Sequence, residues 1–278
     1  MPTLQIISDL HLESPKAYDV FDIVPRAPHL ALLGDIGNVV AHKGEFFGFI
    51  TKQLRQFQAV LFVPGNHEAY GSDWPSTLRT LKYFEEDVKR RRKLDSEHDR
   101  ELGEFVLLDR GTFELAGTHT DQPIIMLGCS LFSHVPPERE MAVEMGLQDF
   151  FQIGSWDIDA HNKAHARDLE WLNGELRGLE QKDAKLVIPT HWSPTVDSRS
   201  IDPRHAGSSI VAGFSTDLKQ QPCFLSENVV LWAFGHTHYK CDFAHERENA
   251  SPIRLVTNQR GYYFAQAQGF DPEKVIEL

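Results

Sequence analysis

The length, composition and charge of the chain exclude several classes of protein. It has 278 residues, of which 41% are hydrophobic and 10% aromatic, so it is globular and long enough to bury a sizeable core. Its formal net charge of −12 disfavours binding to extended nucleic acid, because that mode requires basic residues that release counterions. No segment resembles a membrane span or a signal peptide, so the sequence predicts a cytoplasmic protein that does not bind membranes.

Short apolar runs recur along the chain and predict strands that are buried on both faces. These runs cover residues 4–8, 29–34, 59–65, 105–109, 123–128, 185–191, 229–235 and 253–257. Helical patterns cover residues 44–57, 73–94 and about 160–179. Strands that alternate with helices in the first half, followed by more closely spaced strands, predict an α/β fold with sheets packed face to face and helices outside.

Two local features refine this prediction. Asp73 and Pro75 are suited to the N-cap and first turn of the second helix. The charge run at residues 89–101 is typical of the solvated end of a helix and its following loop.

The segment at about 129–160 interrupts the alternation of strands and helices. It is rich in Pro, Met, Phe and Trp and reads as a long irregular insertion. Loops of this length in compact domains are functional or disordered, and the aromatic content favours an ordered lid or pocket wall. We therefore expect one domain over residues 1–278 with this inserted segment.

Polar residues follow five of the predicted strands. They are Asp9 and His11, Asp35, Asn66 and His67, His191, and His236 and His238. Each alone has an ordinary explanation as a cap, a turn residue or a structural histidine. Together they would converge on one rim of a parallel or mixed sheet, where the carboxylates would repel one another unless cations were bound.

The spacing and chemistry of these residues predict two metal ions. Residues two apart in an extended segment point the same way, so Asp9 with His11, and His236 with His238, can each face one site. Carboxylate, amide and imidazole donors without Cys suit Mn²⁺, Fe or Zn²⁺ in five or six coordination. Seven donors, without His67, are too many for one such ion and fit two ions that share a bridging carboxylate.

These residues resemble the signature of the calcineurin-like metallophosphoesterases. The signature has five ordered blocks, which stand here as Asp9-Leu10-His11, Gly34-Asp35, Gly65-Asn66-His67-Glu68, His191, and Gly235-His236-Thr237-His238. The resemblance implies a four-layer αββα sandwich with mixed sheets flanked by helices. It also implies two divalent metal ions: the first held by Asp9, His11 and His238, the second by Asn66, His191 and His236, with Asp35 bridging both. One departure is Asn38, which stands where many members carry an acid.

Two residues beside the predicted ligands carry further expectations. His67 follows Asn66 directly, so we expect it beside the ions without binding them, as a catalytic residue that stabilises transition-state charge or protonates the leaving group. Glu68 either orients His67 or forms a salt bridge or cap after the turn.

The activity expected from this resemblance is hydrolysis of a phosphoester by a metal-bridging hydroxide. The loop at 191–209 would set specificity, with His205 as a candidate substrate contact, and Phe150, Phe151 and Trp156 would wall a pocket. Basic clusters of the kind that bind a dianionic terminal phosphate are not obvious near the motifs, and the nearest basic residues are Arg199 and Arg204. A small phosphodiester, such as a nucleotide or cyclic nucleotide, is therefore favoured as the substrate. Phosphomonoester hydrolysis at the same site and a non-catalytic metal-binding scaffold are the alternatives.

Overall fold

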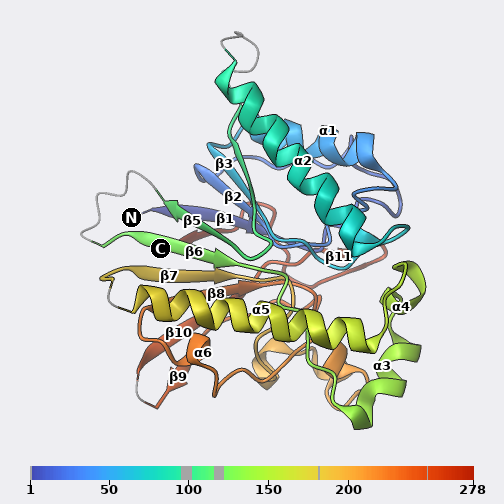
Figure 1. Ribbon diagram of the computed structural model, residues 1–278, viewed down its shortest axis with the longest axis vertical. Helices are drawn as coiled ribbons and strands as arrows, with labels where there is room; N and C mark the ends of the chain where they lie inside the picture. The colour runs from blue at the N-terminus through green and yellow to red at the C-terminus, as the bar shows by residue number, and fades with distance from the viewer. Residues whose placement is uncertain (1, 95–101, 116–121, 181, 249) are drawn as a thin grey trace.

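The chain folds into two β-sheets that pack face to face, with helices on both outer surfaces (Figure 1). The computed structural model describes residues 2–94, 102–115, 122–180, 182–248 and 250–278. The predicted four-layer αββα sandwich is therefore confirmed. Among the described residues, no helix is both long enough and apolar enough to cross a membrane.

The first sheet has the strand order β13-β1-β2-β3-β4. These strands are β13 (Val275–Glu277), β1 (Thr3–Ile7), β2 (His29–Leu32), β3 (Ala59–Phe62) and β4 (Glu104–Leu107). Strands β1 to β4 are parallel and β13 is antiparallel to β1. Because β1, β2 and β3 run in the same direction, the segments that follow them leave the sheet at one edge.

The second sheet has the order β5-β6-β7-β8-β10-β9. Its strands are β5 (Gly111–Leu115), β6 (Ile124–Gly128), β7 (Lys185–Pro189), β8 (Val229–Phe234), β10 (Ala250–Thr257) and β9 (Asp242–Arg247). The four central strands are parallel, and β5 and β9 are antiparallel edges. A small hairpin, β11 (Gly261–Tyr262) with β12 (Ala265–Gln266), follows β10.

Three apolar layers hold the sandwich together. One fills the space between the sheets and includes Leu4, Ala31 and Leu61 from the first sheet, with Met126 and Val187 from the second. The alternation of side chains along each strand directs the neighbouring residues to the helices instead.

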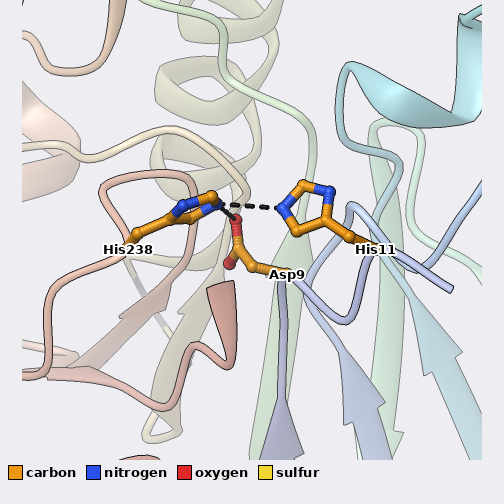
Figure 2. A group of neighbouring side chains, drawn as sticks. All are labelled: Asp9, His11 and His238. Carbon is orange, nitrogen blue, oxygen red and sulfur yellow. Dashed lines mark hydrogen bonds and ion pairs between the residues drawn. The ribbon is translucent and has the colours of Figure 1, made fainter. Parts of the chain in front are cut away.

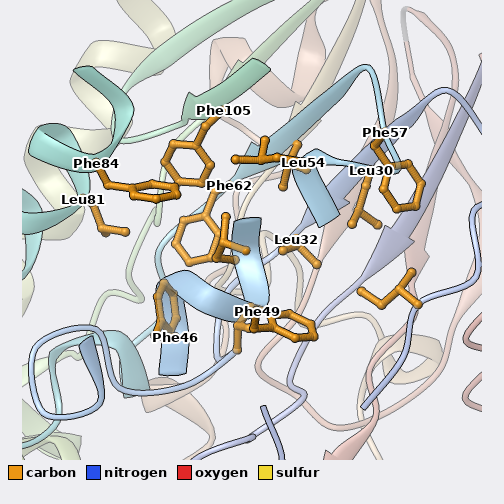
Figure 3. Packing of buried hydrophobic residues seen from close by; sticks show 14 of the residues in the cluster. Leu30, Leu32, Phe46, Phe49, Leu54, Phe57, Phe62, Leu81, Phe84 and Phe105 are labelled. Atoms are coloured by element: carbon orange, nitrogen blue, oxygen red, sulfur yellow. The ribbon is translucent and has the colours of Figure 1, made fainter. Parts of the chain in front are cut away.

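The outer layers cover the remaining faces. Helices α1 (Lys43–Leu54) and α2 (Trp74–Lys93) cover the first sheet, where Leu30, Leu32 and Phe62 pack against Phe46 and Phe84 (Figure 3). Helices α5 (Ile158–Leu179) and α6 (Pro222–Leu225) cover the second sheet. This packing fixes both sheets, and with them the loops at their carboxyl edge.

The predicted elements are all present in the structure at approximately the predicted bounds. Each of the eight predicted strands and three predicted helices has a counterpart, and the Asp73 carboxylate caps α2 by accepting a bond from Ser76 N at 2.7 Å. The strands β5, β9, β11, β12 and β13 were not predicted. In the charge run, α2 continues to Lys93, and residues 95–101 lie outside the described residues.

The segment at 129–160 is more regular than the sequence predicted. It contains a 3₁₀ turn, η2 (Pro137–Arg139), and two short helices, α3 (Glu140–Gly146) and α4 (Asp149–Gln152), before α5 begins. The role of this segment as a lid or pocket wall, and the assignment of residues 1–278 to a single domain, remain predictions.

Candidate metal centre

The seven predicted metal ligands lie together at the carboxyl edge of both sheets. Asp9 and His11 follow β1, Asp35 follows β2, and Asn66 follows β3, whereas His191 follows β7 and His236 and His238 follow β8. All are buried except His238, which is partly exposed. The site is therefore built where the two sheets meet, from segments more than 200 residues apart in sequence.

The first group of donors is Asp9, His11 and His238, whose potential ligand atoms lie within 4.8 Å of one another (Figure 2). The two imidazoles face each other, with 2.9 Å between His11 Nε2 and His238 Nε2. The carboxylate Oδ1 of Asp9 lies 3.3 Å from His238 Nε2. Three donors thus point at one small volume.

The second group is Asp35, His191 and His236, which meets the same distance limit. His191 Nε2 lies 3.4 Å from Asp35 Oδ1 and 3.1 Å from Asn66 Oδ1. The other carboxylate oxygen, Asp35 Oδ2, lies 4.0 Å from His11 Nε2. Asp35 therefore faces both groups, as the resemblance implied for a bridging residue.

The backbone at these strand ends is unusual. Five of the donors have positive φ: Asp9 (54°), His11 (48°), Asp35 (54°), His236 (68°) and His238 (47°). Residues other than glycine rarely adopt this region, and such residues gather at functional sites. The left-handed turns bend the chain back so that its side chains converge.

Glycines make this close approach possible. A Cβ atom on Gly34 would collide with the ring of His191 and lie 2.7 Å from Gly65 N, and a Cβ on Gly65 would collide with the Asp35 carboxylate. Gly34 and Gly65 therefore allow the side chains of the site to pack closely, in addition to forming turns.

Backbone contacts set the orientation of individual donors. His191 Nδ1 lies 2.7 Å from Leu33 O, so this nitrogen carries the proton and Nε2 presents a lone pair to the second group. The Asp9 carboxylate accepts from His236 N at 3.1 Å. Burial alone would raise the pKa of Asp35, but the positive charges that His191 and His67 carry when no cation is bound hold that pKa well below its ordinary value.

The donor set fits two divalent cations. His236, a member of the second group, is buried, and its Nε2 has no hydrogen-bond partner among the described residues. The facing imidazole nitrogens of His11 and His238, next to an Asp9 carboxylate, are equally well explained as ligands of a shared ion. Imidazole, carboxylate and amide donors suit Mn²⁺, Fe or Zn²⁺.

His67 lies next to both groups of donors. Its Nε2 lies 3.9 Å from Asp35 Oδ2 and 3.4 Å from the Tyr262 hydroxyl, and its ring stacks on Tyr70 with 4.1 Å between centroids. Burial alone would lower the pKa of His67, but the Asp35 and Glu13 carboxylates raise it to about 9. The imidazole thus directs one nitrogen toward the Asp35 carboxylate.

The other nitrogen of His67 contacts a residue that the sequence analysis missed. His67 Nδ1 lies 2.7 Å from Glu13 Oε1. The motif Asp9-Leu10-His11 continues with the same alternation to Glu13, which is the signal that could have identified it. Asn38, which stands where many family members carry an acid, donates from its side-chain amide to the backbone oxygen of His67 at 2.8 Å.

Of the two roles expected for Glu68, orienting His67 or forming a salt bridge or cap after the turn, its contacts correspond to a cap. Its carboxylate accepts backbone N–H groups of Asp35 (2.9 Å), Ile36 (2.8 Å) and Gly65 (2.6 Å). The side chain points back beneath the turn because these N–H groups are buried and need acceptors. Glu68 therefore ties the turns after β2 and β3 together.

Asp149, in the 129–160 segment, is a second residue that the sequence did not identify. Its Oδ1 accepts from Asn66 Nδ2 at 2.8 Å and from the Tyr70 hydroxyl at 2.6 Å. Burial raises the pKa of this carboxyl. Since the Asn66 amide nitrogen is bound here, its oxygen faces His191, as a metal ligand requires. No motif marks Asp149, because the contact depends on tertiary packing.

The comparisons with known proteins agree with this geometry. The family model for calcineurin-like phosphoesterases matches residues 3–240. The chain belongs to the calcineurin-like phosphoesterase family. Its two-metal donor set and family support a metal-dependent phosphoester hydrolase.

Individual relatives are distant from this phosphoesterase. An uncharacterized protein of Acanthamoeba polyphaga mimivirus, L509, is 26% identical over 302 residues, with 100% of this chain and 97% of that protein covered. A phosphopantetheinyl hydrolase from Mycobacterium tuberculosis is similar in structure, with a TM-score of 0.61, 17% identity and coverage of 94% and 90% of the two chains. A dimetal phosphatase from Danio rerio has a TM-score of 0.46 and 15% identity, with 92% and 86% covered.

A pocket of about 310 Å³ opens from the donor groups of the phosphoesterase. Its lining includes Asp35, Asn66, His67, His236 and His238 at one end. Residues from the 146–149 and 201–215 segments form the other end, and His205 is one of them.

One expectation about this pocket differs from the structure. The aromatic residues expected to wall it do not line it: Phe151 is exposed, Phe150 packs beneath α3, and Trp156 packs against Trp74. Leu147 and Asp149 line the pocket instead, because α3 and α4 turn the aromatic side chains away from it. Arg199 and Arg204 do not line the pocket either.

Proposed function

We propose that this phosphoesterase hydrolyses small phosphodiesters, with nucleotides and cyclic nucleotides among the candidates, in a centre for two divalent cations. The observation that carries the preference for diesters is the charge of the pocket. Among the described residues, no Lys or Arg lines it, whereas Asp149 and Asp202 do. The terminal phosphate of a monoester carries a second negative charge, which these carboxylates would repel, whereas the phosphate of a diester carries only one.

The basic residues nearest the pocket are engaged elsewhere. Arg199 binds Asp197, with 2.7 Å between Nη2 and Oδ2, and Arg204 binds Asp202 at 2.6 Å. Both pairs are local and bidentate. Neither guanidinium is directed at the donor groups, so neither supplies the clamp that a dianionic phosphate favours.

The ligand assignment follows the two groups of donors. Asp9, His11 and His238 would hold one cation, Asn66, His191 and His236 the other, and Asp35 would contact both. When bound, two divalent cations would polarise the phosphoryl oxygens and lower the pKa of a bound water. We propose Mn²⁺, Fe or Zn²⁺, in keeping with the donor types.

His67 is the catalytic residue in this proposal. Its Nε2 faces Asp35 and the pocket, at a position where it can donate a hydrogen bond to a phosphoryl oxygen or a proton to the leaving oxygen. Glu13 is a positioning residue, because it holds Nδ1 and thereby fixes the ring so that Nε2 points into the site. Stacking on Tyr70 limits rotation of the same ring.

The test compares bis(p-nitrophenyl) phosphate with p-nitrophenyl phosphate, using metal-depleted protein that has been reconstituted with Mn²⁺. We expect faster turnover of the diester. His67→Ala should keep both metal ions and lose turnover, whereas Asn66→Ala should lose or weaken the second ion. Metal content is measured on every sample.

The outcomes separate the possible functions. A preference for the monoester would contradict the diester proposal and identify a phosphomonoesterase. Protein that binds two metal ions but hydrolyses neither compound would favour a non-catalytic scaffold. If His67→Ala is as active as the wild type, the role proposed for His67 is wrong.

A further inference from the structure

The end of the pocket away from the donor groups differs from them in chemistry. Five apolar side chains form one side of it, and we call them the outer wall: Leu147, Ile201, Ile210, Val211 and Phe214. The wall begins directly at the metal centre, because the ring of Phe214 stacks on His236 with 4.8 Å between centroids and 27° between planes.

The outer wall is anchored in its own apolar cluster. Val143 and Leu147 from the α3 region are buried with Val135 and Ile158, and Ile210 and Phe214 pack against them. The wall thus rests on a packed base and is not a mobile surface loop.

Glycines fix the contacts inside this base. A Cβ on Gly146 would lie 2.7 Å from Ile210 Cγ2, and a Cβ on Gly213 would lie 2.8 Å from Leu147 Cδ2. At such separations alanine would force the facing side chain, Ile210 or Leu147, to shift. The two segments that form the wall are therefore in close contact at these glycines.

The polar side chains at this end are carboxylates, one imidazole and one hydroxyl. Asp202, His205 and Ser208 lie on the rim, and Asp149 lies between the rim and the donor groups. No Lys or Arg lines the pocket within the described part of the chain. A second phosphate or a carboxylate on the ligand would therefore find no Lys or Arg of the lining to pair with, and would approach the carboxylate of Asp149.

We propose that the outer wall is a binding site for one uncharged, largely apolar ester arm of the phosphodiester substrate, and that it rejects arms with a further anionic group. This inference rests on the proposed function, since the phosphate itself would lie at the metal centre. A volume of about 310 Å³ is at the lower end for organic ligands and suits one ring or a short chain. The proposal therefore predicts poor binding of diesters that carry additional phosphate groups.

The test measures binding to Mn²⁺-loaded protein by calorimetry for three diesters that differ in one arm. They are dimethyl phosphate, methyl phenyl phosphate and methyl 4-carboxyphenyl phosphate. Burial of a phenyl ring should tighten binding roughly tenfold or more over the dimethyl compound. The carboxylate should cancel most of that gain.

Two variants locate the effect at the outer wall. Ile210→Asp should remove the advantage of the phenyl arm, and Ile210→Ser should reduce it, where the advantage is the ratio of the affinities for methyl phenyl phosphate and dimethyl phosphate in each variant. Val20→Asp places the same charge at an exposed hydrophobic position outside the pocket and should change nothing. Asp202→Lys should favour the carboxyphenyl arm, whereas Asp19→Lys, with the same change in net charge at an exposed site, should not.

Equal affinity for the dimethyl and phenyl compounds, or tightest binding of the carboxyphenyl compound, would overturn the inference. Because the readout is binding, it can be separated from the proposed function. Arm selectivity without any diester turnover would contradict the function alone. Diester turnover without arm selectivity would contradict this inference alone.

Discussion

The two ends of the pocket are built in opposite ways. At the metal centre, buried polar side chains stand directly after β-strands, and left-handed backbone turns aim them at one another. At the outer wall, apolar side chains come from short helices and 3₁₀ turns that lie between the strands. The first end depends on local sequence blocks and the second on packing between distant segments.

This difference separates the part of the molecule that positions the metal ligands from the part that shapes the pocket. The parallel strands bring the ligands to one edge whatever the connecting loops contain. The loops can then shape a pocket without disturbing the ligands. We therefore expect substitutions at the metal centre to affect turnover of every substrate, and substitutions at the outer wall to affect only substrates that have a suitable arm.

The largest effect should come from Asp35→Asn. Asp35 faces both donor groups, so the loss of its charge weakens both cation sites at once. We expect turnover to fall roughly 10³-fold or more, since a metal centre supplies several kcal/mol of transition-state stabilisation. Metal analysis should find fewer than two ions per chain. Two fully occupied sites in this variant would contradict the bridging position.

A smaller effect is expected from Glu13→Gln. The variant keeps the shape of the side chain but loses the charge that holds His67 Nδ1 at 2.7 Å. We expect kcat to fall about 10- to 100-fold, as is typical when a residue that orients an imidazole is changed, with KM and metal content nearly unchanged. Glu13→Asp should restore part of the activity.

The matched control for Glu13 is Glu45→Gln, which removes an exposed carboxylate bound to Lys16 at 3.0 Å. It should leave kcat unchanged. A Glu13→Gln enzyme that loses metal, or that changes KM and not kcat, would show that Glu13 supports the ligands and does not position His67.

The sequence predicted the metal centre better than the outer wall for a physical reason. Donors such as His191 follow directly after apolar strands, and the order of the strands brings those ends together. Glu13 extended the same alternation and could have been found. Asp149 could not, because its contact with Asn66 depends on how α4 packs, and the aromatic residues nearby turned away from the pocket. Loop packing of this kind has no periodic pattern in sequence.

The stability of the fold should be sensitive to acid at a buried histidine near the start of α5. Burial lowers the pKa of His161, on the first turn of α5, to about 3 from an ordinary value of 6.5. Between pH 6.5 and about 3 the unfolded chain binds the proton of His161 more readily than the folded chain does. The contribution of neutral His161 to the free energy of unfolding is therefore complete above pH 6.5 and is lost as the pH falls toward 3. The expected slope is about 1.4 kcal/mol per pH unit for this one group.

Denaturant unfolding at pH 7.5 and pH 5 measures this effect. The stability lost between the two should be smaller in His161→Gln than in the wild type, by about 2 kcal/mol. His165 lies one turn along, and burial also lowers its pKa, so some dependence remains. Dissociation of metal at low pH affects both proteins and cancels in the comparison. An identical pH dependence would show that His161 does not stay neutral in the folded state.

The smallest effect should come from Gly213→Ala, and it separates the two ends most cleanly. The added methyl group must displace Leu147, which it would otherwise approach to 2.8 Å, so the outer wall shifts while the ligands remain in place. We expect the affinity for methyl phenyl phosphate to fall a few-fold, and the affinity for dimethyl phosphate and the metal content to stay unchanged. Gly44→Ala is the control, because a Cβ there meets nothing within 4 Å. If Gly213→Ala weakens binding of both diesters equally, the outer wall and the metal centre are coupled and the division of tasks is wrong.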